Sequence, residues 1–412
     1  MILTREKKEI WSSFEKMSFR FLFLYFSLYV LSIFTSSLWE PVINWIGTFV
    51  FNIDYDFSSN GRGSGDTTYA YLMLFLFLCF SILGNIIWSF LDRKRKSYNQ
   101  LQYGLLVGLR FILIFFMFTY GIVKIFHLQM PALSNSDLIS TFGNKSPMGL
   151  AWDFMGFSKT YSVFAGLAEV TAGILLISRR TQTYGAIATI VVMLNVFMMN
   201  LCFDIPVKIF SFHLMLMGIL ILMADFKRFF GVVVLNKNIN NYTIYPQQNK
   251  EDRKIIMISK TVLFLVTTVF FILTSYPRYK KRYLNSKSPL YGIWQVTKFQ
   301  KNRQNTFTES SLKERWNYIT IDQNKYATIK TLDDKLLPYK FTVDTVNNNI
   351  FFGKFREKKL DTLTYQKNDS MLFIKGVFKN DTLNIQLKFK SPEDFLLKSR
   401  GFHWVNEYPL NR

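Results

Sequence analysis

The sequence predicts a polytopic α-helical membrane bundle of about seven spanning helices, followed by an all-β, barrel-like domain. Three observations support this fold class. Half of the 412 residues are hydrophobic and 43 are phenylalanine, more than the polar surface of a soluble protein of this size accommodates. The apolar residues gather in runs of about twenty, the length that crosses a bilayer. After Ser286 these runs give way to short segments with period-two alternation.

Seven apolar segments reach or approach the length of a membrane span. They lie at 19–38, 69–90, 104–127, 160–178, 183–203, 208–225 and 256–276. The first run lacks a small-residue cleavage site, so we expect an uncleaved helix in place of a signal peptide. The apolar stretch after Pro41 is too short to span, and its tryptophans indicate an interfacial helix. The glycine-rich stretch 60–69 lacks the lysine of a phosphate-binding loop, and we expect an outer loop there.

Basic residues predict the orientation of the chain. Clusters of Lys and Arg lie at 5–20, 93–96, 179–180 and 227–254. Seven helices place these clusters on one side, which the positive-inside rule makes cytoplasmic. The opposite loops contain Asp54, Asp56, Asp66, Asp137 and Asp153. A basic cluster at 278–282 is an exception to the rule, but we still expect a cytoplasmic N-terminus and an extracytoplasmic C-terminal domain.

The formal net charge of +22 lies largely beside the apolar runs, where basic side chains orient helices and contact anionic lipid. No nucleic-acid recognition motif accompanies it, so we expect the lipid bilayer as a partner and no nucleic acid. The two cysteines, Cys79 and Cys202, form no CxxC pair, which argues against a dithiol oxidoreductase; we expect both to be buried as small apolar side chains. No Cys/His cluster has metal-ligand spacing and no hydrolase motif occurs, so no metal site is predicted.

The C-terminal domain is predicted from about eight short runs, each bounded by Asn, Asp, Lys or Gly turns. Consecutive strands with short turns favour an up-and-down antiparallel barrel. The opening Gly292 and Trp294, spaced as Gly-x-Trp, resemble the first strand of lipocalin-like barrels. The interior of such a barrel is filled either by a small apolar ligand or by its own side chains, and the sequence leaves both open.

Polar side chains within membrane helices are costly, so each is a candidate for function. The candidates are Lys124, Glu169, Asn195, Asn200, Asp204, Lys208 and His213. Glu169 is the strongest, because it lies roughly 15 Å below the outer surface at the standard helical rise. A carboxylate there takes up a proton or pairs with a cation, for which Lys124, Lys208 and His213 are available. Two interpretations follow: proton transfer or hydrogen bonding to a quinone-like head group, and a paired carboxylate that holds helices together.

The residues from 110 to 228 resemble the DoxX-like family of bacterial membrane proteins. The resemblance rests on Gly121 and Lys124 in a G-x-x-K, on SPMGLAWDFMGFSKTYSVFAGLAEVTAGILLISRR with its glutamate and arginine pair, and on MLNVFMMNLCFDIPVKIFSFHLMLM. The upstream residues resemble the N-terminal extension of larger members. The resemblance implies a four-helix core in the bacterial cytoplasmic (inner) membrane. It also implies a link to quinone-linked oxidoreductases or to thiol redox balance, without a catalytic constellation to transfer.

The expected organisation has four parts: an N-terminal extension at 1–100, a DoxX-like core at 101–230, a cytoplasmic loop with the last helix at 231–285, and the β domain at 286–412. The expected function is an accessory or quinone-interacting component of an envelope redox system, with a redox partner protein, rather than a stand-alone enzyme. The alternatives are a non-enzymatic anchored envelope protein, whose barrel binds a partner or apolar ligand, and a small-solute transporter, for which no internal repeat is visible.

Overall fold

The computed structural model describes residues 10–53, 65–236, 250–302, 313–322, 326–354 and 360–410. The basic residues before Ile10, the aspartates at 54 and 56 and positions 60–64 of the glycine-rich stretch lie outside these residues. The chain forms two compact units. The first comprises the described parts of 1–129 and 160–275, and the second comprises 130–159 and the described parts of 276–412.

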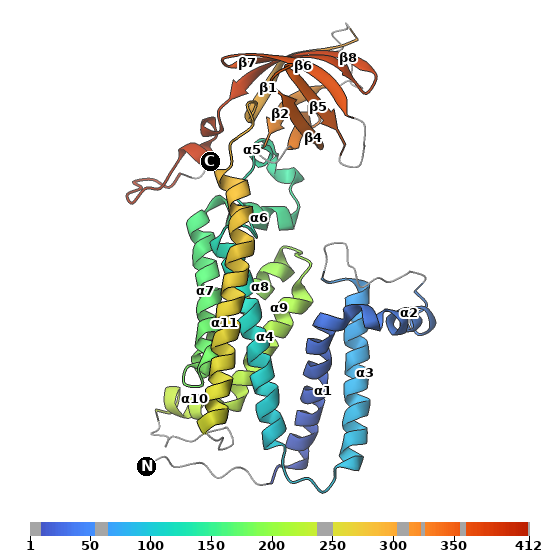
Figure 1. The fold of residues 1–412 in the computed structure, drawn as a ribbon, viewed down its shortest axis with the longest axis vertical. Coiled ribbons are helices and arrows are strands. Elements are labelled where there is room, and N and C mark those ends of the chain that lie inside the picture. Colours follow the sequence, from blue (N-terminus) through green and yellow to red (C-terminus); the bar gives the residue numbers. More distant parts are fainter. Residues whose placement is uncertain are drawn as a thin grey trace. The chain divides into compact units, whose positions relative to one another are not determined.

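The first unit is a helical bundle (Figure 1). Its helices are α1 (Ser13–Thr35), α2 (Glu40–Phe49), α3 (Thr68–Leu91), α4 (Asn99–Ile125), α7 (Lys159–Ile177), α8 (Gln182–Cys202), α9 (Lys208–Ala224), α10 (Phe226–Val233) and α11 (Lys250–Tyr279), whose last residues belong to the second unit. Six helical spans among the described residues are long and apolar enough to cross a membrane, so this is a multi-pass membrane fold. The sixth predicted segment, 208–225, is α9, an apolar helix below the usual spanning length.

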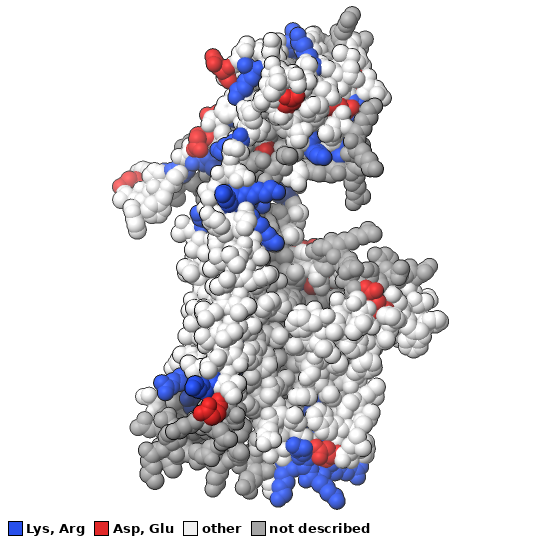
Figure 2. Space-filling view, viewed as in Figure 1, with Lys and Arg blue, Asp and Glu red and all other residues white. Residues whose placement is uncertain are grey.

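Helix α4 forms the centre of the bundle. Its side chains Leu113, Ile114 and Met117 are fully buried in an apolar cluster that includes residues of α1, α3, α7, α8 and α9. Charged side chains gather toward the ends of this unit, and the middle of its visible surface is almost entirely uncharged (Figure 2). That distribution is typical of a bundle whose surroundings are hydrocarbon.

The N-terminal helices begin where the sequence supplies caps. Ser12 and Glu15 form a capping box that fixes the start of α1. Pro41 lies in the first turn of α2, where its missing N–H is tolerated. The apolar face of α2 packs on α3, while Trp45 and Phe49 are exposed, which fits the expected short interfacial helix.

The second unit contains a closed antiparallel barrel in which each strand pairs with the next and β8 pairs with β1. The strands are β1 (Gly292–Lys301), β2 (Trp316–Ile321), β3 (Tyr326–Thr331), β4 (Leu336–Asp344), β5 (Asn349–Gly353), β6 (Asp361–Asn368), β7 (Met371–Phe378) and β8 (Asp381–Lys390). Gly292 has a φ of +134°, and a Cβ there would lie 2.5 Å from the ring of Phe389. Only glycine fits this position, which explains the Gly-x-Trp spacing.

Aromatic and aliphatic side chains fill the interior of the barrel. The rings of Trp316, Phe352 and Phe378 pack together with centroids 5.4–6.3 Å apart, and Phe378 meets both of the others edge to face. Trp294 donates its indole N–H to the carbonyl of Leu290, 2.9 Å away. Of the two fillings that the sequence left open, the described interior is occupied by the protein's own core.

The segment 130–159 packs with the barrel, although we expected it within a continuous core at 101–230. It contains α5 (Asn135–Ile139) and α6 (Pro147–Phe157). Asn135 Nδ2 donates to the carbonyl of Ile321 at 3.1 Å, and Lys330 Nζ donates to the carbonyl of Ile139 at 2.8 Å. These bonds satisfy backbone groups at both partners and tie the inserted segment to β2 and β3.

Candidate functional site

Two glycines bring α4 and α7 into close contact. A Cβ on Gly121 would lie 2.8 Å from the carbonyl oxygen of Gly166, and a Cβ on Gly166 would lie 2.5 Å from that of Gly121. Neither position has space for a methyl group, so the backbones touch at this level. Small residues permit this approach between membrane helices. Each glycine precedes a charged residue by three positions, so Lys124 and Glu169 lie on the same contacting faces.

Lys124 and Glu169 form a buried ion pair in which Lys124 Nζ donates to Glu169 Oε1. The two residues are 4% and 1% exposed. Helical side chains lean toward the N-terminus of their helix, which carries the ammonium back from the end of α4 toward the middle of α7. The structure thus brings together the leading candidate carboxylate and one of its three candidate cations.

The surroundings of the pair fix one partner and leave the other partly unpaired. The carbonyl of Lys124 accepts hydrogen bonds from Ser162 Oγ at 3.1 Å and from the backbone N–H of His127 at 2.8 Å. Glu169 Oε2 is buried and accepts no hydrogen bond from any described residue. The site therefore holds a fixed lysine backbone and a carboxylate with one oxygen still available to a proton or a donor.

A buried lysine–glutamate pair can move its proton from one partner to the other without changing the net charge of the site. Separated charges are costly in a low-dielectric interior, so ammonium and carboxylate are tolerated there as a pair. Transfer of the proton from Nζ to the carboxylate produces a neutral amine and a neutral acid. Both states have the same total charge, and the unpaired Oε2 offers a second position for the proton.

His213 belongs to a different cluster, on the face between α9 and α1. Its Nε2 lies 2.8 Å from Tyr25 Oη, and its ring stacks on Tyr29 with centroids 3.9 Å apart. His213 Nδ1 lies 2.7 Å from the carbonyl of Ile209, which can only accept, so Nδ1 carries the proton and neutral Nε2 accepts from Tyr25. The expectation that His213 partners Glu169 is therefore wrong for the described residues. Sequence reasoning did not identify the two tyrosines, whose positions depend on how α1 and α9 are rotated.

The remaining candidate residues lie near the N-terminal end of α9 or face outward. Asp66 accepts from the backbone N–H groups of Lys208 and Ile209 at 2.7 and 3.0 Å, which caps α9. Lys208 pairs with Asp204 at 2.9 Å, away from Glu169. Asn200 Nδ2 donates to Ser211 Oγ at 3.0 Å, and Asn195 is exposed on α8. These residues thus do not join the ion pair in one polar site.

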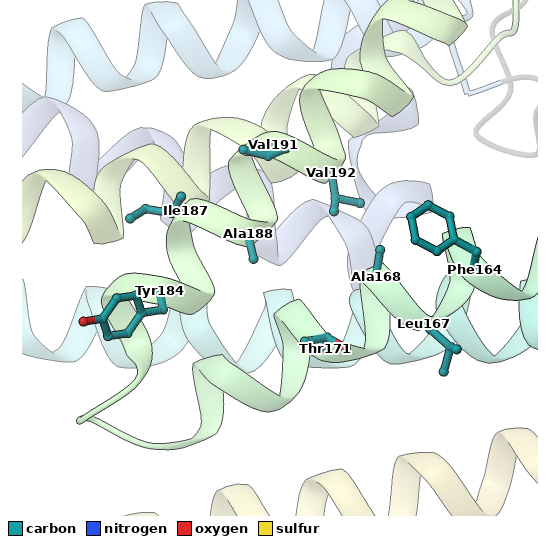
Figure 3. Close-up of a pocket in the computed structure, with 9 residues that line it drawn as sticks. All are labelled: Phe164, Leu167, Ala168, Thr171, Tyr184, Ile187, Ala188, Val191 and Val192. Carbon is teal, nitrogen blue, oxygen red and sulfur yellow. The ribbon is translucent and has the colours of Figure 1, made fainter.

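An apolar groove of about 530 Å³ lies between α7 and α8 (Figure 3). Its lining consists of Phe164, Leu167, Ala168, Thr171, Tyr184, Ile187, Ala188, Val191 and Val192. Thr171 and Tyr184 supply its polar side-chain atoms. At about 100° per residue, Leu167, Ala168 and Thr171 are displaced by about 100–160° around α7 from Glu169. The groove and the ion pair therefore lie on different faces of the same helix.

Besides Arg20, three further buried charges lie within or beside the predicted spans and are not among the predicted candidates. Arg110 is fully buried and donates to the carbonyl of Leu176 through Nε, at 3.0 Å, and through Nη2. Lys260 is buried with its Nζ 5.8 Å from the ring centroid of Phe111. Asp225 accepts from Thr183 Oγ1 at 2.6 Å and pairs with Arg228. The signal for Arg110 and Lys260 was present, because both interrupt apolar runs of spanning length.

Among the described residues, no group of three or more His, Cys, Asp or Glu side chains is arranged to hold a metal ion. Both cysteines are free thiols; Cys202 is exposed and Cys79 partly buried, so the expectation that both are buried is wrong. Cys202 ends α8, where an apolar thiol can face hydrocarbon as well as a protein core.

No family model matches the chain, and no solved structure matches it. The chain is similar to an uncharacterized protein, YwoB, of Bacillus subtilis (strain 168). The two are 32% identical over 132 residues, which cover 30% of this chain and 78% of YwoB.

Proposed function

This chain belongs to the same family as YwoB, whose name states no activity, and from the buried site we propose a component of an envelope redox system. In this proposal the Lys124–Glu169 pair carries a proton within the membrane, and a redox partner protein supplies the electron chemistry. The protein is then an accessory subunit of the DoxX-like type and not a stand-alone enzyme. It lies in the bacterial cytoplasmic membrane, with its N-terminus inside and its barrel outside.

The observation that carries this proposal is the unpaired Oε2 of Glu169 beside a paired Oε1. A carboxylate that only holds two helices together is most stable when both oxygens are satisfied, because an unpaired buried acceptor costs about 1–3 kcal/mol. The unpaired oxygen is the position at which a proton, a water molecule or a donor group of a ligand can bind. When Oε2 takes up a proton, the Glu169 carboxyl becomes neutral and lies beside the ammonium of Lys124.

A quinone fits this structure in part. The groove between α7 and α8 is lined almost entirely by apolar side chains, which suits an isoprenoid or acyl tail. It does not place a ring beside Glu169, since the groove residues face away from that side chain. A head group in the groove would instead meet Thr171 and Tyr184, so quinone binding and proton transfer are separate parts of the proposal.

The experiment is quantitative mass spectrometry of the organic extract from protein purified in mild detergent, for wild type, Glu169→Gln and Ala168→Phe. The bulky ring at 168 fills the groove and leaves the ion pair in place. We expect about one quinone per chain in wild type and in Glu169→Gln, and loss of the quinone in Ala168→Phe. When an added two-electron chemical reductant converts the bound quinone to the quinol, a pH indicator should report uptake of two protons in wild type and slower uptake in Glu169→Gln. Loss of quinone in Glu169→Gln alone would assign the head group to the ion pair. Bulk phospholipid alone in all three proteins would contradict the redox proposal.

The second candidate is a non-enzymatic envelope protein in which the bundle anchors the barrel. The direct backbone contact at Gly121 and Gly166 favours it, because an ion pair at such a contact can serve to fix two helices. In that case an uncharged replacement of both Lys124 and Glu169 leaves the partner interactions of the barrel intact. A transporter is the third candidate, and substrate flux into reconstituted vesicles would support it.

A further inference from the structure

The last residues of the chain leave the barrel at the end where the chain enters it. The chain enters at Gly292, a few residues after the π-helical turn Lys280–Leu284 that follows α11. Ile293 at the start of β1 pairs with Lys390 at the end of β8. Residues from Ser391 onward therefore begin beside the entry point and continue from the end of the barrel that is connected to α11.

These residues form a structured element, the C-terminal hook, which we define as residues 395–410. It starts with the short helix α12 (Leu396–Ser399) and then folds back on itself. Arg400 holds the fold by contacting His403 Nε2 at 3.0 Å and by donating to Asn406 Oδ1. Asn406 Nδ2 in turn donates to the carbonyl of His403 at 3.2 Å. The polar groups of the hook thus bond to one another.

The apolar side chains of the hook point outward. Phe402 is 77% exposed and Trp404 is 90% exposed, although their rings contact each other at 5.0 Å. Every described residue from Gly401 to Leu410 is exposed. The hook therefore exposes apolar and aromatic side chains, and its visible face is largely uncharged except for an acidic group at its tip (Figure 2). Exposed apolar surface of this kind marks a binding surface.

Basic side chains flank this surface. Lys280, Lys281 and Arg282 follow α11, and Lys390, Lys398 and Arg400 frame the start of the hook. Lys390 Nζ lies 4.7 Å from the ring centroid of Phe395, which connects the end of β8 to the hook. The cluster after α11 is the one that departs from the positive-inside pattern. Attraction of this basic cluster to anionic lipid head groups, at the membrane surface where α11 ends, accounts for the departure.

We propose that the C-terminal hook is an interfacial membrane anchor that inserts Phe402, Trp404 and Val405 into the lipid leaflet from which α11 emerges. Tryptophan and tyrosine favour the boundary between head groups and acyl chains, and Trp404 and Tyr408 are both available. The hook stays close to the bilayer because the barrel is joined through the chain to α11, a membrane helix. Binding of the hook to lipid therefore needs no protein partner. The basic flank attracts phosphate head groups, and the aromatic rings insert beneath them.

The test uses full-length protein reconstituted in vesicles, with Cys79 and Cys202 replaced by serine and one nitroxide label attached to Val405→Cys. Val377→Cys is the matched control, because it is an exposed valine on β7 near the opposite end of the barrel. Collision rates with oxygen, which dissolves in lipid, and with a water-soluble nickel chelate report the depth of each label. We expect the label at 405 to lie about 5–10 Å below the phosphates and the label at 377 to lie in water.

The vesicles consist of phosphatidylcholine with or without phosphatidylglycerol, and removal of the anionic lipid should reduce the depth at 405. A further Phe402→Ala, Trp404→Ala background should return the label at 405 to water without changing the label at 377. Equal access of the nickel chelate to both labels would overturn the proposal. A label at 405 that neither reagent reaches would also overturn it, because it would show the hook packed against protein, such as a second copy of the chain.

Discussion

Gly121 and Gly166 face each other across α4 and α7 so closely that a Cβ on Gly166 would lie 2.5 Å from the carbonyl oxygen of Gly121. The same two faces carry Lys124 and Glu169, each three residues after the glycine of its own helix. Contact between the backbones thus sets the spacing at which the ammonium reaches the carboxylate. Helix packing and the charge chemistry of the site depend on the same two glycines.

Gly166→Ala should therefore destabilise the bundle. The added methyl group has to push α4 and α7 apart, and overpacking of this kind costs about 1–3 kcal/mol. Gly108→Ala on α4 is the control, since nothing lies within 4 Å of its Cβ position. We expect that control to leave stability unchanged or to raise it by up to about 1 kcal/mol through helix propensity. Thermal unfolding in detergent measures both, and equal midpoints for the two variants would contradict the close contact.

The ion pair should behave as a coupled unit. Lys124→Met or Glu169→Leu alone leaves one buried group without its charge partner, and breaking a buried pair costs about 3–5 kcal/mol. The double replacement Lys124→Met, Glu169→Leu should recover most of that loss because no charge remains. Unfolding by denaturant in a double-mutant cycle measures the coupling. Additive losses would show that the two side chains do not interact, whereas a stable double variant without proton uptake would separate folding from function.

The fold could be predicted largely from pattern. The length of the apolar runs predicted six of the spanning helices, because each run must satisfy its backbone within one helix in lipid. Period-two alternation predicted the eight strands, whose closure into a barrel followed from short consecutive turns. What pattern did not show was the association of 130–159 with the barrel. Asn135 and Ile321 are 186 positions apart, and no periodicity records such a bond.

The candidate site could be predicted only in part. Intramembrane charge identified Glu169 and Lys124, and their glycines were visible at the same spacing. The rotation of α9 about its axis decides whether His213 meets Glu169 or Tyr25, and sequence alone does not specify it. The same limit hid the role of Arg110, whose donors reach the last carbonyls of α7, groups that every helix end leaves unpaired.

Removal of the Asp66 carboxylate should loosen the start of α9. Asp66 accepts from two backbone N–H groups that have no partner within the helix, so Asp66→Ala should cost about 1 kcal/mol. Asp66→Asn retains one acceptor oxygen and should cost less. Hydrogen–deuterium exchange at Lys208 and Ile209 reports the change directly. Unchanged protection of these amides in Asp66→Ala would contradict the cap.

The contact between Asn135 and Asp322 should depend on pH. Burial raises the pKa of the Asp322 carboxyl above its usual range, although the Asn135 N–H that donates to it opposes the shift; Asp137 raises the pKa further and Arg282 lowers it. The folded protein therefore keeps a proton on Asp322 at pH values where the unfolded chain has lost it. Stability is then fully present below the usual aspartate pKa and falls as pH rises through the raised value.

The slope of stability against pH can be measured by hydrogen–deuterium exchange in the segment around Asn135. Exchange is expressed as protection relative to the intrinsic rate at each pH. Wild type should lose protection as pH rises through that window, and Asp322→Asn should remove the slope because the amide does not titrate. Asp344→Asn is the control: that carboxylate is exposed, and hydrogen bonds from Asn347 hold its pKa below the usual range. It should therefore retain the wild-type slope. The same slope in Asp322→Asn and wild type would assign the pH dependence to another group.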